Sequence, residues 1–256
     1  MNILVCVKAV AAQPEDPQIA DGGFNVRLHS KSFSMNESDE HALERALSLK
    51  KEAGGTVTVL TVGSVRSQDV LFRCLGKGAD AAIRVDGDEF DANVTALKLA
   101  RAVGKLAYDV ILTGVESLDG MSSQVGLLVA ARLGIACAYG VVGIDLARPG
   151  TLRVDREIGG GRRQTLEIDT PALLSVQSGS EPPSYPPAAK LIQARRRPIP
   201  FWSAGDLGLS ENELRRERRL KFLGLERAKA GGTIEWIAGT PEEVASVLIT
   251  RVRQAL

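Results

Sequence analysis

Short apolar runs alternate with longer amphipathic segments along the first half of the chain. Each apolar run has the length of one buried strand, and together they cover residues 3–7, 56–62, 81–85 and 109–113. Apolar residues recur at helical spacing in the segments between and after them, at residues 36–50, 68–75, 91–107 and 127–134. Strands that alternate with helices in this way predict right-handed crossovers and a parallel sheet.

The pattern changes after residue 136. Residues 138–144 are typical of one more strand, and residues 172–176 form another buried apolar run. Residues 152–158 and 164–168 alternate apolar and polar side chains on either side of three glycines, which predicts an antiparallel hairpin. The predicted fold class is therefore α/β, with a doubly wound, mostly parallel sheet, an antiparallel hairpin and a C-terminal extension.

Two parts of the chain lack this alternation. Residues 13–34 are a polar excursion, with a hairpin expected around residues 24–28. Beyond Gly179 the chain is proline-rich at first, then basic at residues 188–197, where we expect a short helix, and it ends in an amphipathic segment at residues 241–256. We therefore expect an α/β domain at residues 1–180, followed by an arm and a docking helix at residues 181–256.

Capping residues mark three of the expected helix starts. Asn36 or Ser38 can cap the helix that begins near residue 37, and Asp91 can cap the helix expected at residues 91–107. Thr240 can cap the last helix, whose first turn holds two glutamates.

Overall charge and cysteine content exclude several classes of protein. The 256 residues have a formal net charge of +1, so nothing global indicates nucleic acid or a membrane surface as a partner. No apolar run is long enough to insert in a membrane and the first residues do not resemble a signal peptide, so we expect a cytoplasmic protein. Cys6 and Cys137 lie in apolar runs, where burial is expected rather than disulfide pairing. His29 and His41 lack neighbouring ligands, which argues against zinc or haem.

A polar turn that contains glycine lies between the strand expected at residues 109–113 and the helix that follows. It runs from Gly114 to Gly126. Such a turn places unpaired backbone N–H groups and the positive end of a helix where an anion can bind, so a nucleotide phosphate is the first ligand to test. Many turns of this kind bind nothing, and on this turn alone both interpretations stay open.

Motifs of self-contained catalysts are missing from the sequence. No G-x-G-x-x-G follows the first strand, and neither G-x-x-x-x-G-K-[ST] nor G-x-S-x-G occurs. The turn after Val62 lacks the glycine-rich loop with which ATP pyrophosphatases hold the leaving phosphates. Together these absences favour a binding subunit.

Several segments, in order along nearly the whole chain, resemble the beta subunit family of the electron transfer flavoproteins. The first five are Val5-Cys6-Val7-Lys8, Met35-Asn36-x-x-Asp39-Glu40-x-Ala42-Leu43-Glu44-x-Ala46-Leu47, Gly76-x-Gly78-Ala79-Asp80, Gly114-x-x-x-x-Asp119-Gly120-x-x-Ser123-Gln124-Val125-Gly126 and Val154-Asp-Arg156-Glu157-Ile-Gly-Gly-Gly161. The others are Pro171-Ala172-Leu173, Glu181-Pro182, Ala194-Arg-Arg-Arg197 and Asp206-Leu207-Gly208. No single motif is decisive, and it is the ordered set that makes the resemblance specific.

The resemblance implies an electron carrier subunit rather than a self-contained catalyst. Such a subunit forms a heterodimer with a larger alpha subunit, and the pair carries electrons between a dehydrogenase and a downstream acceptor. The FAD that delivers the electrons lies mainly on the alpha subunit, and the beta subunit holds AMP in most members or a second FAD in members that split electron pairs. The cofactor-binding positions that carry over are Cys6, Asn36, Glu37, Ser38, Asp39, Val62, Gly114, Val115, Glu116, Ser117, Leu118, Asp119, Gly120, Met121, Ser122, Ser123, Gln124 and Val125.

Elementary chemistry assigns roles within this set. Most of the positions follow strands at one edge of a parallel sheet, where ligands collect. Ser122, Ser123 and the nearby backbone N–H groups are the best phosphate binders. Asp119 is expected to cap the helix instead, because its charge would repel a phosphate.

The chain departs from the family pattern at several places. Glu37 stands where proline is usual, and Gly120 with the Gln124-Val125-Gly126 end is more similar to the FAD-carrying members. Ala188 takes the place of a leucine that anchors acyl-CoA dehydrogenases, which puts that partner in doubt. The arginines at 195–197 either contact an acidic partner or form a solvated basic turn.

Two other functions remain as alternatives. A stand-alone adenine-nucleotide sensor of the universal-stress-protein type would explain the sheet and the turn, but not the arm. An ATP-consuming ligase or pyrophosphatase lacks the loop it would need after Val62.

Overall fold

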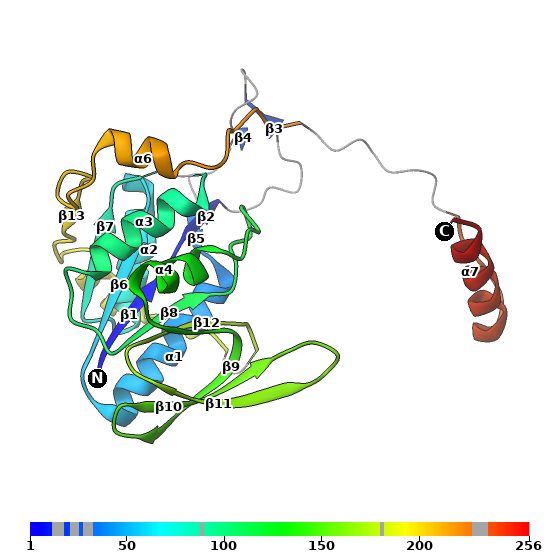
Figure 1. Cartoon of the computed structure of the whole chain (residues 1–256), viewed down its shortest axis with the longest axis horizontal. Helices are drawn as coiled ribbons and strands as arrows, with labels where there is room; N and C mark the ends of the chain where they lie inside the picture. Colours follow the sequence, from blue (N-terminus) through cyan, green and yellow to red (C-terminus); the bar gives the residue numbers. More distant parts are fainter. Residues whose placement is uncertain are drawn as a thin grey trace. The chain divides into compact units, whose positions relative to one another are not determined.

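A nine-stranded sheet forms the centre of the fold (Figure 1). The computed structural model describes residues 1–11, 18–20, 26–27, 33–87, 90–179, 182–226 and 235–255. The strand order across the sheet is β11-β10-β9-β12-β8-β1-β6-β7-β13. These strands are β1 Asn2–Cys6, β6 Thr56–Val62, β7 Ala81–Val85, β8 Val110–Gly114, β9 Ala136–Arg148, β10 Thr151–Glu157, β11 Arg163–Asp169, β12 Ala172–Val176 and β13 Phe201–Trp202.

The strand directions confirm the expected fold class. β1 pairs in parallel with both β6 and β8, and β12 pairs in parallel with both β8 and β9. β10 runs antiparallel to β9 and to β11, and the second of these pairs is the expected hairpin. Within the described residues, four short strands lie outside the large sheet: β2 Ala9–Ala11, β3 Gln18–Ile19, β4 Val26–Arg27 and β5 Phe33–Met35.

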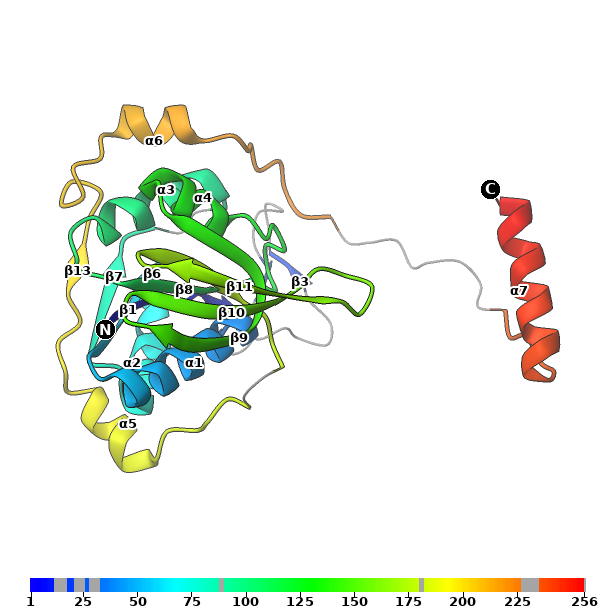
Figure 2. The same ribbon diagram turned by 60° about the horizontal axis from the view of Figure 1, so that its bottom comes forward.

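Helices cover both faces of the parallel strands (Figure 2). α1 and α2 lie on one face, with α5 packed on α2, while α3 and α4 lie on the other, with α6 against α3. The bounds are α1 Glu37–Ala53, α2 Gln68–Lys77, α3 Ala92–Val103, α4 Val125–Leu133, α5 Ala188–Ala194, α6 Glu211–Glu217 and α7 Pro241–Ala255, with a 3-10 turn at Val65–Ser67.

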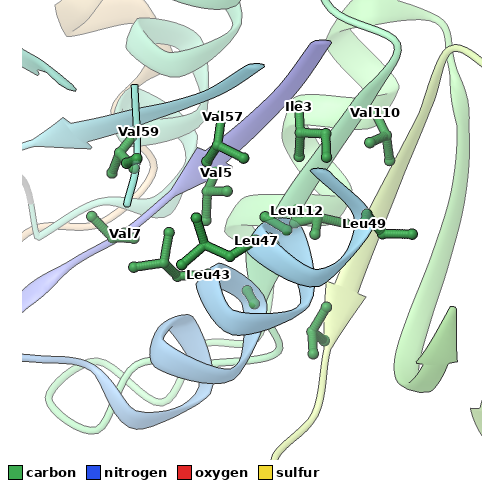
Figure 3. Close-up of a cluster of buried hydrophobic side chains, with 14 of the residues drawn as sticks. Ile3, Val5, Val7, Leu43, Leu47, Leu49, Val57, Val59, Val110 and Leu112 are labelled. Carbon is green, nitrogen blue, oxygen red and sulfur yellow. The ribbon is translucent and has the colours of Figure 1, made fainter. Parts of the chain in front are cut away.

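The alternation of side chains along β1 builds two cores. Ile3, Val5 and Val7 point into the cluster that contains Leu43 and Leu47 of α1 (Figure 3). Leu4 and Cys6 point to the opposite face, into the cluster under α3 and α4. Strands of a parallel sheet are buried on both faces, so they are read in sequence as continuous apolar runs. Each fully buried leucine stabilises the fold by about 1.5–3 kcal/mol.

Some details differ from the sequence predictions. β9 is much longer than the strand predicted at residues 138–144, and β13 had not been predicted at all. The expected burial of Cys137 is wrong. Ala138 points into the core beside α1, and its neighbour Cys137 therefore points to the other face, where it is exposed. Cys6 is buried as expected.

The residue contacts divide the described chain into two units. The first comprises Met1–Gln18 and Arg27–Leu223 and contains the large sheet with α1 to α6. The second comprises Ile19–Val26 and Gly224–Leu256 and contains α7. Residues 182–223 of the expected arm thus belong with the sheet. Of the hairpin expected around residues 24–28, only β4 lies within the described residues.

The predicted capping residues have different outcomes. The carboxylate of Asp91 accepts a 2.8 Å hydrogen bond from the backbone N–H of Asn93 at the start of α3, as predicted. At the start of α7, Thr240 Oγ1 accepts from the N–H of Glu243 at 3.4 Å, and the Glu243 carboxylate accepts from the N–H of Thr240 at 2.8 Å.

In the described part of the chain, no helix is both long and apolar enough to cross a bilayer.

Candidate functional site

The order of strands reverses at β1. The chain first adds β6 and β7 on one side of β1, and it then returns to add β8 and β12 on the other. The carboxyl ends of the strands at such a switch point are where open α/β sheets bind ligands. Three segments meet there: the residues that follow β1, the start of α1, and the turn between β8 and α4.

Asp39 joins the ends of β1 and β8. Its buried carboxylate accepts a 2.7 Å hydrogen bond from the backbone N–H of Lys8 and a 3.0 Å bond from the N–H of Gly114. A Cβ at Gly114 would collide with the Ser38 hydroxyl and the Asp39 carboxylate, so this close approach requires glycine. Burial raises the pKa of Asp39 to about 7, while the two backbone N–H groups, Asn36 and the Lys8 charge act in the opposite direction.

Asn36 binds the turn after β8 rather than its own helix. Its amide nitrogen donates to the carbonyl oxygen of Glu116 at 2.7 Å, and its amide oxygen accepts from the N–H of Leu118 at 3.0 Å. Ser38 donates to the same Glu116 carbonyl at 2.8 Å. Asn36 is therefore at the N-cap position of α1 as predicted, but neither its side chain nor that of Ser38 caps the helix, because the turn takes them both.

Lys8 contacts the same turn from the end of β1. Its ammonium group lies 2.6 Å from a carboxylate oxygen of Asp119 and 3.3 Å from the hydroxyl of Ser117. Partial burial acts to raise the pKa of Asp119, but the hydrogen bond and charge of Lys8 lower it below its usual value.

The expected capping of α4 by Asp119 is wrong. α4 begins at Val125, and Gln124, which is in the N-cap position, makes no capping hydrogen bond with its side chain. The Asp119 carboxylate is drawn instead to Lys8, a cation that is distant in sequence and adjacent in space. Lys8 was not among the predicted site residues, although it belongs to the Val7-Lys8 pair that helped to indicate the family. That pair was the available signal.

The second half of the turn has an unusual backbone. Met121 and Ser123 have φ values of 45° and 53°, the left-handed region that non-glycine residues rarely adopt. Gln124, which follows, is right-handed. Alternation of this kind forms concave arrays of N–H groups that bind anions, and left-handed residues, which cost about 1–3 kcal/mol each, occur preferentially at ligand clamps. Ser123 donates its hydroxyl proton to the Glu116 carboxylate at 3.0 Å.

Gly126 lets the first turn of α4 lie directly against the strand ends. A Cβ at this position would stand 2.7 Å from both the Thr113 hydroxyl and the Ser175 hydroxyl. These two buried hydroxyls, at the ends of β8 and β12, are 3.0 Å apart and hydrogen-bonded to each other. The positive end of the α4 dipole therefore lies at the carboxyl edge of the sheet.

The other predicted site residues lie at strand ends or are exposed. Cys6 is buried at the end of β1, and burial, followed by the Asp39 charge, raises the pKa of its thiol to about 12, so it is neutral. Val62 ends β6 and is half-buried, and Val115 donates its N–H to the Val176 carbonyl at 3.1 Å. The exposed predicted residues are Glu37, Glu116, Leu118, Asp119, Gly120, Met121, Ser122 and Gln124. Within the described residues, no cluster of three or more His, Cys, Asp or Glu residues could hold a metal ion.

Comparison with known proteins gives a consistent family. Residues 24–207 match the family model described as electron transfer flavoprotein domain. The chain is 33% identical to the electron transfer flavoprotein subunit beta of Methylophilus methylotrophus, over 99% of this chain and 98% of that relative. It is 28% identical to the subunit of the same name from Clostridium acetobutylicum, again over 99% of this chain and 98% of the relative.

Proposed function

Because the chain belongs to the electron transfer flavoprotein family, among its beta subunits, we propose that it pairs with an alpha subunit and binds an adenine nucleotide at the turn after β8. The pair would carry electrons from a dehydrogenase to a downstream acceptor. A flavin held by the pair, when bound, supplies the electron-accepting chemistry. The described residues of this chain supply the nucleotide site.

The start of α4 is the observation that carries the proposal. It lies against the strand ends through Gly126, the side chain of its N-cap residue Gln124 does not cap it, and two left-handed residues precede it. These features together favour a phosphate at this position, since N–H groups at a helix start bind anions and the helix dipole stabilises their charge. Ser122, Ser123 and the backbone of residues 121–125 are the groups that would hold it.

The buried polar residues beneath the turn would support this site without touching the ligand. Asn36, Ser38 and Asp39 use their side chains on the backbone of residues 8, 114, 116 and 118. This fixes the first half of the turn to β1 and α1. The second half is then positioned by rigid elements, which suits a binding site.

The nucleotide itself is proposed to be AMP or a second FAD. Gly120 bears on the choice, because the exposed backbone at a glycine allows the close approach that a second phosphate needs. The decisive experiment is to co-express the chain with its alpha subunit, denature the purified complex and quantify the released nucleotides. Two FAD per pair would identify a member with FAD in both sites, and one FAD with one AMP a simple carrier. A complex that releases no nucleotide beyond one FAD would overturn the proposed site.

Substitution of Gly120 tests where the nucleotide binds. A Cβ at Gly120 would stand 3.3 Å from the Ser117 hydroxyl and 3.8 Å from the Lys8 ammonium nitrogen, so a larger side chain would crowd the groups at the proposed phosphate site. We expect Gly120→Leu to lower the nucleotide of the beta site at least tenfold and to leave the flavin of the alpha subunit largely intact. Gly104→Leu, on the exposed end of α3, is the matched control. Equal loss of both nucleotides would sink the site assignment.

The segment before α5 is proposed to face the dehydrogenase partner. Ser184 is held by Glu44, whose carboxylate accepts from the Ser184 N–H at 2.9 Å and from its hydroxyl at 2.8 Å. Lys77 completes the anchor with a 2.9 Å ion pair to Glu44. Tyr185, next in the chain, is 95% exposed. Because Ala188 replaces a larger anchor, we propose that the partner differs from the acyl-CoA dehydrogenases.

A further inference from the structure

The backbone of Lys8 is fixed while its side chain remains half-exposed. The Lys8 N–H donates to Asp39, and the Lys8 carbonyl accepts from the N–H of Asn36 at 3.0 Å. Both partners are buried residues at the start of α1. The side chain of Lys8 is 41% exposed. The backbone end of this side chain is therefore fixed, while its ammonium group can change partners.

The ammonium group of Lys8 lies at the entrance to the proposed phosphate site. It is 3.3 Å from Ser117 and 2.6 Å from Asp119, and it stands 3.8 Å from the position that a Cβ on Gly120 would take. Gly120 immediately precedes the residues with the left-handed backbone. A lysine on a strand end is thus brought to the turn that the previous subsection assigns to a phosphate.

The negative charges of the turn indicate that a phosphate there would need a nearby cation such as Lys8. The turn has two carboxylates of its own, Glu116, which binds Ser123, and Asp119, which binds Lys8. Both would repel a phosphate in the same turn. Among the described residues, Lys8 forms an ion pair with this turn, and an ammonium group is a strong phosphate ligand.

We propose that Lys8 binds the phosphate of the nucleotide, and that Asp119 is an internal anion which occupies the Lys8 ammonium group until the nucleotide displaces it. This inference rests on the proposed function and adds two residue roles to it. The Lys8–Asp119 pair is half-exposed on both sides, at 41% and 45%, so water screens it and a phosphate can exchange for the carboxylate. The alternative is that the pair only clamps the turn.

The two roles predict effects of opposite sign. We expect Lys8→Gln to weaken the binding of AMP and of FAD about tenfold or more, since one charge-assisted hydrogen bond is lost. We expect Asp119→Asn to strengthen the binding of both several-fold, because Lys8 is freed of its competitor. Lys8→Arg keeps the charge and should retain binding close to that of the wild type. Adenosine, which has no phosphate, should bind all four proteins within about twofold of one another.

The experiment is isothermal titration of the full-length chain, freed of nucleotide, with AMP, FAD and adenosine. Lys51→Gln at the exposed end of α1 and Glu242→Gln in the first turn of α7 are matched controls that make the same charge changes away from the site. Equal weakening by Lys8→Gln and Asp119→Asn would overturn the inference and show a clamp. A loss of adenosine binding in Lys8→Gln would also overturn it. Wild-type chain that binds neither nucleotide would overturn the proposed nucleotide site on which the inference rests.

Discussion

The buried polar residues at the switch point act on the backbone. Asn36 and Asp39 are 1% and 6% exposed, and each satisfies its polar atoms with backbone groups of other segments. Burial without such partners would destabilise the fold, because an unpaired buried polar group costs about 1–3 kcal/mol. The fold therefore depends on Asp39 at the place where β1, β8 and α1 meet.

The pKa of Asp39 makes this junction sensitive to pH. Since the pKa is raised to about 7 from an ordinary value near 3.8, the carboxyl group adds stability at low pH and loses it as the pH rises to about 7. We expect the difference in unfolding free energy between the wild type and Asp39→Asn to fall between about pH 4 and about pH 8, by up to several kcal/mol. Urea unfolding of both proteins across this range measures it. A difference that grows with pH would contradict the assignment.

Individual side-chain partners were the least predictable part of the site. The family resemblance placed Asn36, Ser38, Asp39 and Asp119 in one site, and the expected strand ends beside them agreed with that grouping. The predictions that Asn36 or Ser38 and Asp119 cap helices were wrong, because a side chain such as that of Asn36 can bond to its own helix or to a distant turn with similar geometry. In the structure, Asn36 binds the distant turn, and Asp119 pairs with Lys8. Choices of this kind depend on contacts between residues far apart in the chain.

At the scale of the elements, the position of α4 depends on Gly126, which has no side chain. Gly126→Ala would place a Cβ 2.7 Å from the hydroxyls of Thr113 and Ser175, so the helix start must move away from the strand ends. We expect this substitution to lower the unfolding free energy by about 1–3 kcal/mol and to weaken nucleotide binding. Gly104→Ala is the matched control, because its φ is −61° and the nearest atom to a new Cβ is 3.4 Å away. Equal unfolding free energies for the two variants, in chemical denaturation, would refute the packing argument.

Elements with a strong period were predicted well, and elements fixed by tertiary pairing were not. β1, β6, β7 and β8 are predominantly apolar runs between helices that cover both faces of the sheet, and the alternation of β10 and β11 identified the hairpin. β13 is only Phe201–Trp202 and exists because it pairs with β7, which no local pattern can indicate. β9 extends past its predicted end at residue 144 because β10 pairs with it as far as Arg148.

At the scale of the whole molecule, residues 182–223 are part of the first unit and form a strap that contacts its sheet and helices. Ser184 is bound by Glu44, β13 extends the sheet beside β7, and the guanidinium of Arg84 lies 4.4 Å from the centre of the Phe201 ring. Asp91, at the start of α3, holds the last part of the strap: its carboxylate accepts hydrogen bonds from the N–H groups of residues 219 and 220 at 2.6 and 2.7 Å. The strap also buries Leu207, Leu209 and Leu214 in the core under α3.

The second unit is then the part that we propose docks on the alpha subunit. In α7 the exposed apolar residues are Val247, Leu248, Ile249 and Val252, and a stripe of this kind favours a protein partner. Because the boundary between the two units follows Leu223, we expect different results from a truncation after Leu223 and a truncation after Gly179. The first removes α7 and leaves the strap, and the second removes both.

We expect the chain that ends at Leu223 to keep a melting temperature close to that of the full chain and to lose its association with a co-expressed alpha subunit. The chain that ends at Gly179 should be less stable by several kcal/mol, because each buried leucine of the strap contributes about 1.5–3 kcal/mol. Thermal unfolding and co-purification separate these effects. Association that survives in the Leu223 truncation would show that the partner binds the first unit, and would move the docking surface from α7 to the strap and the sheet.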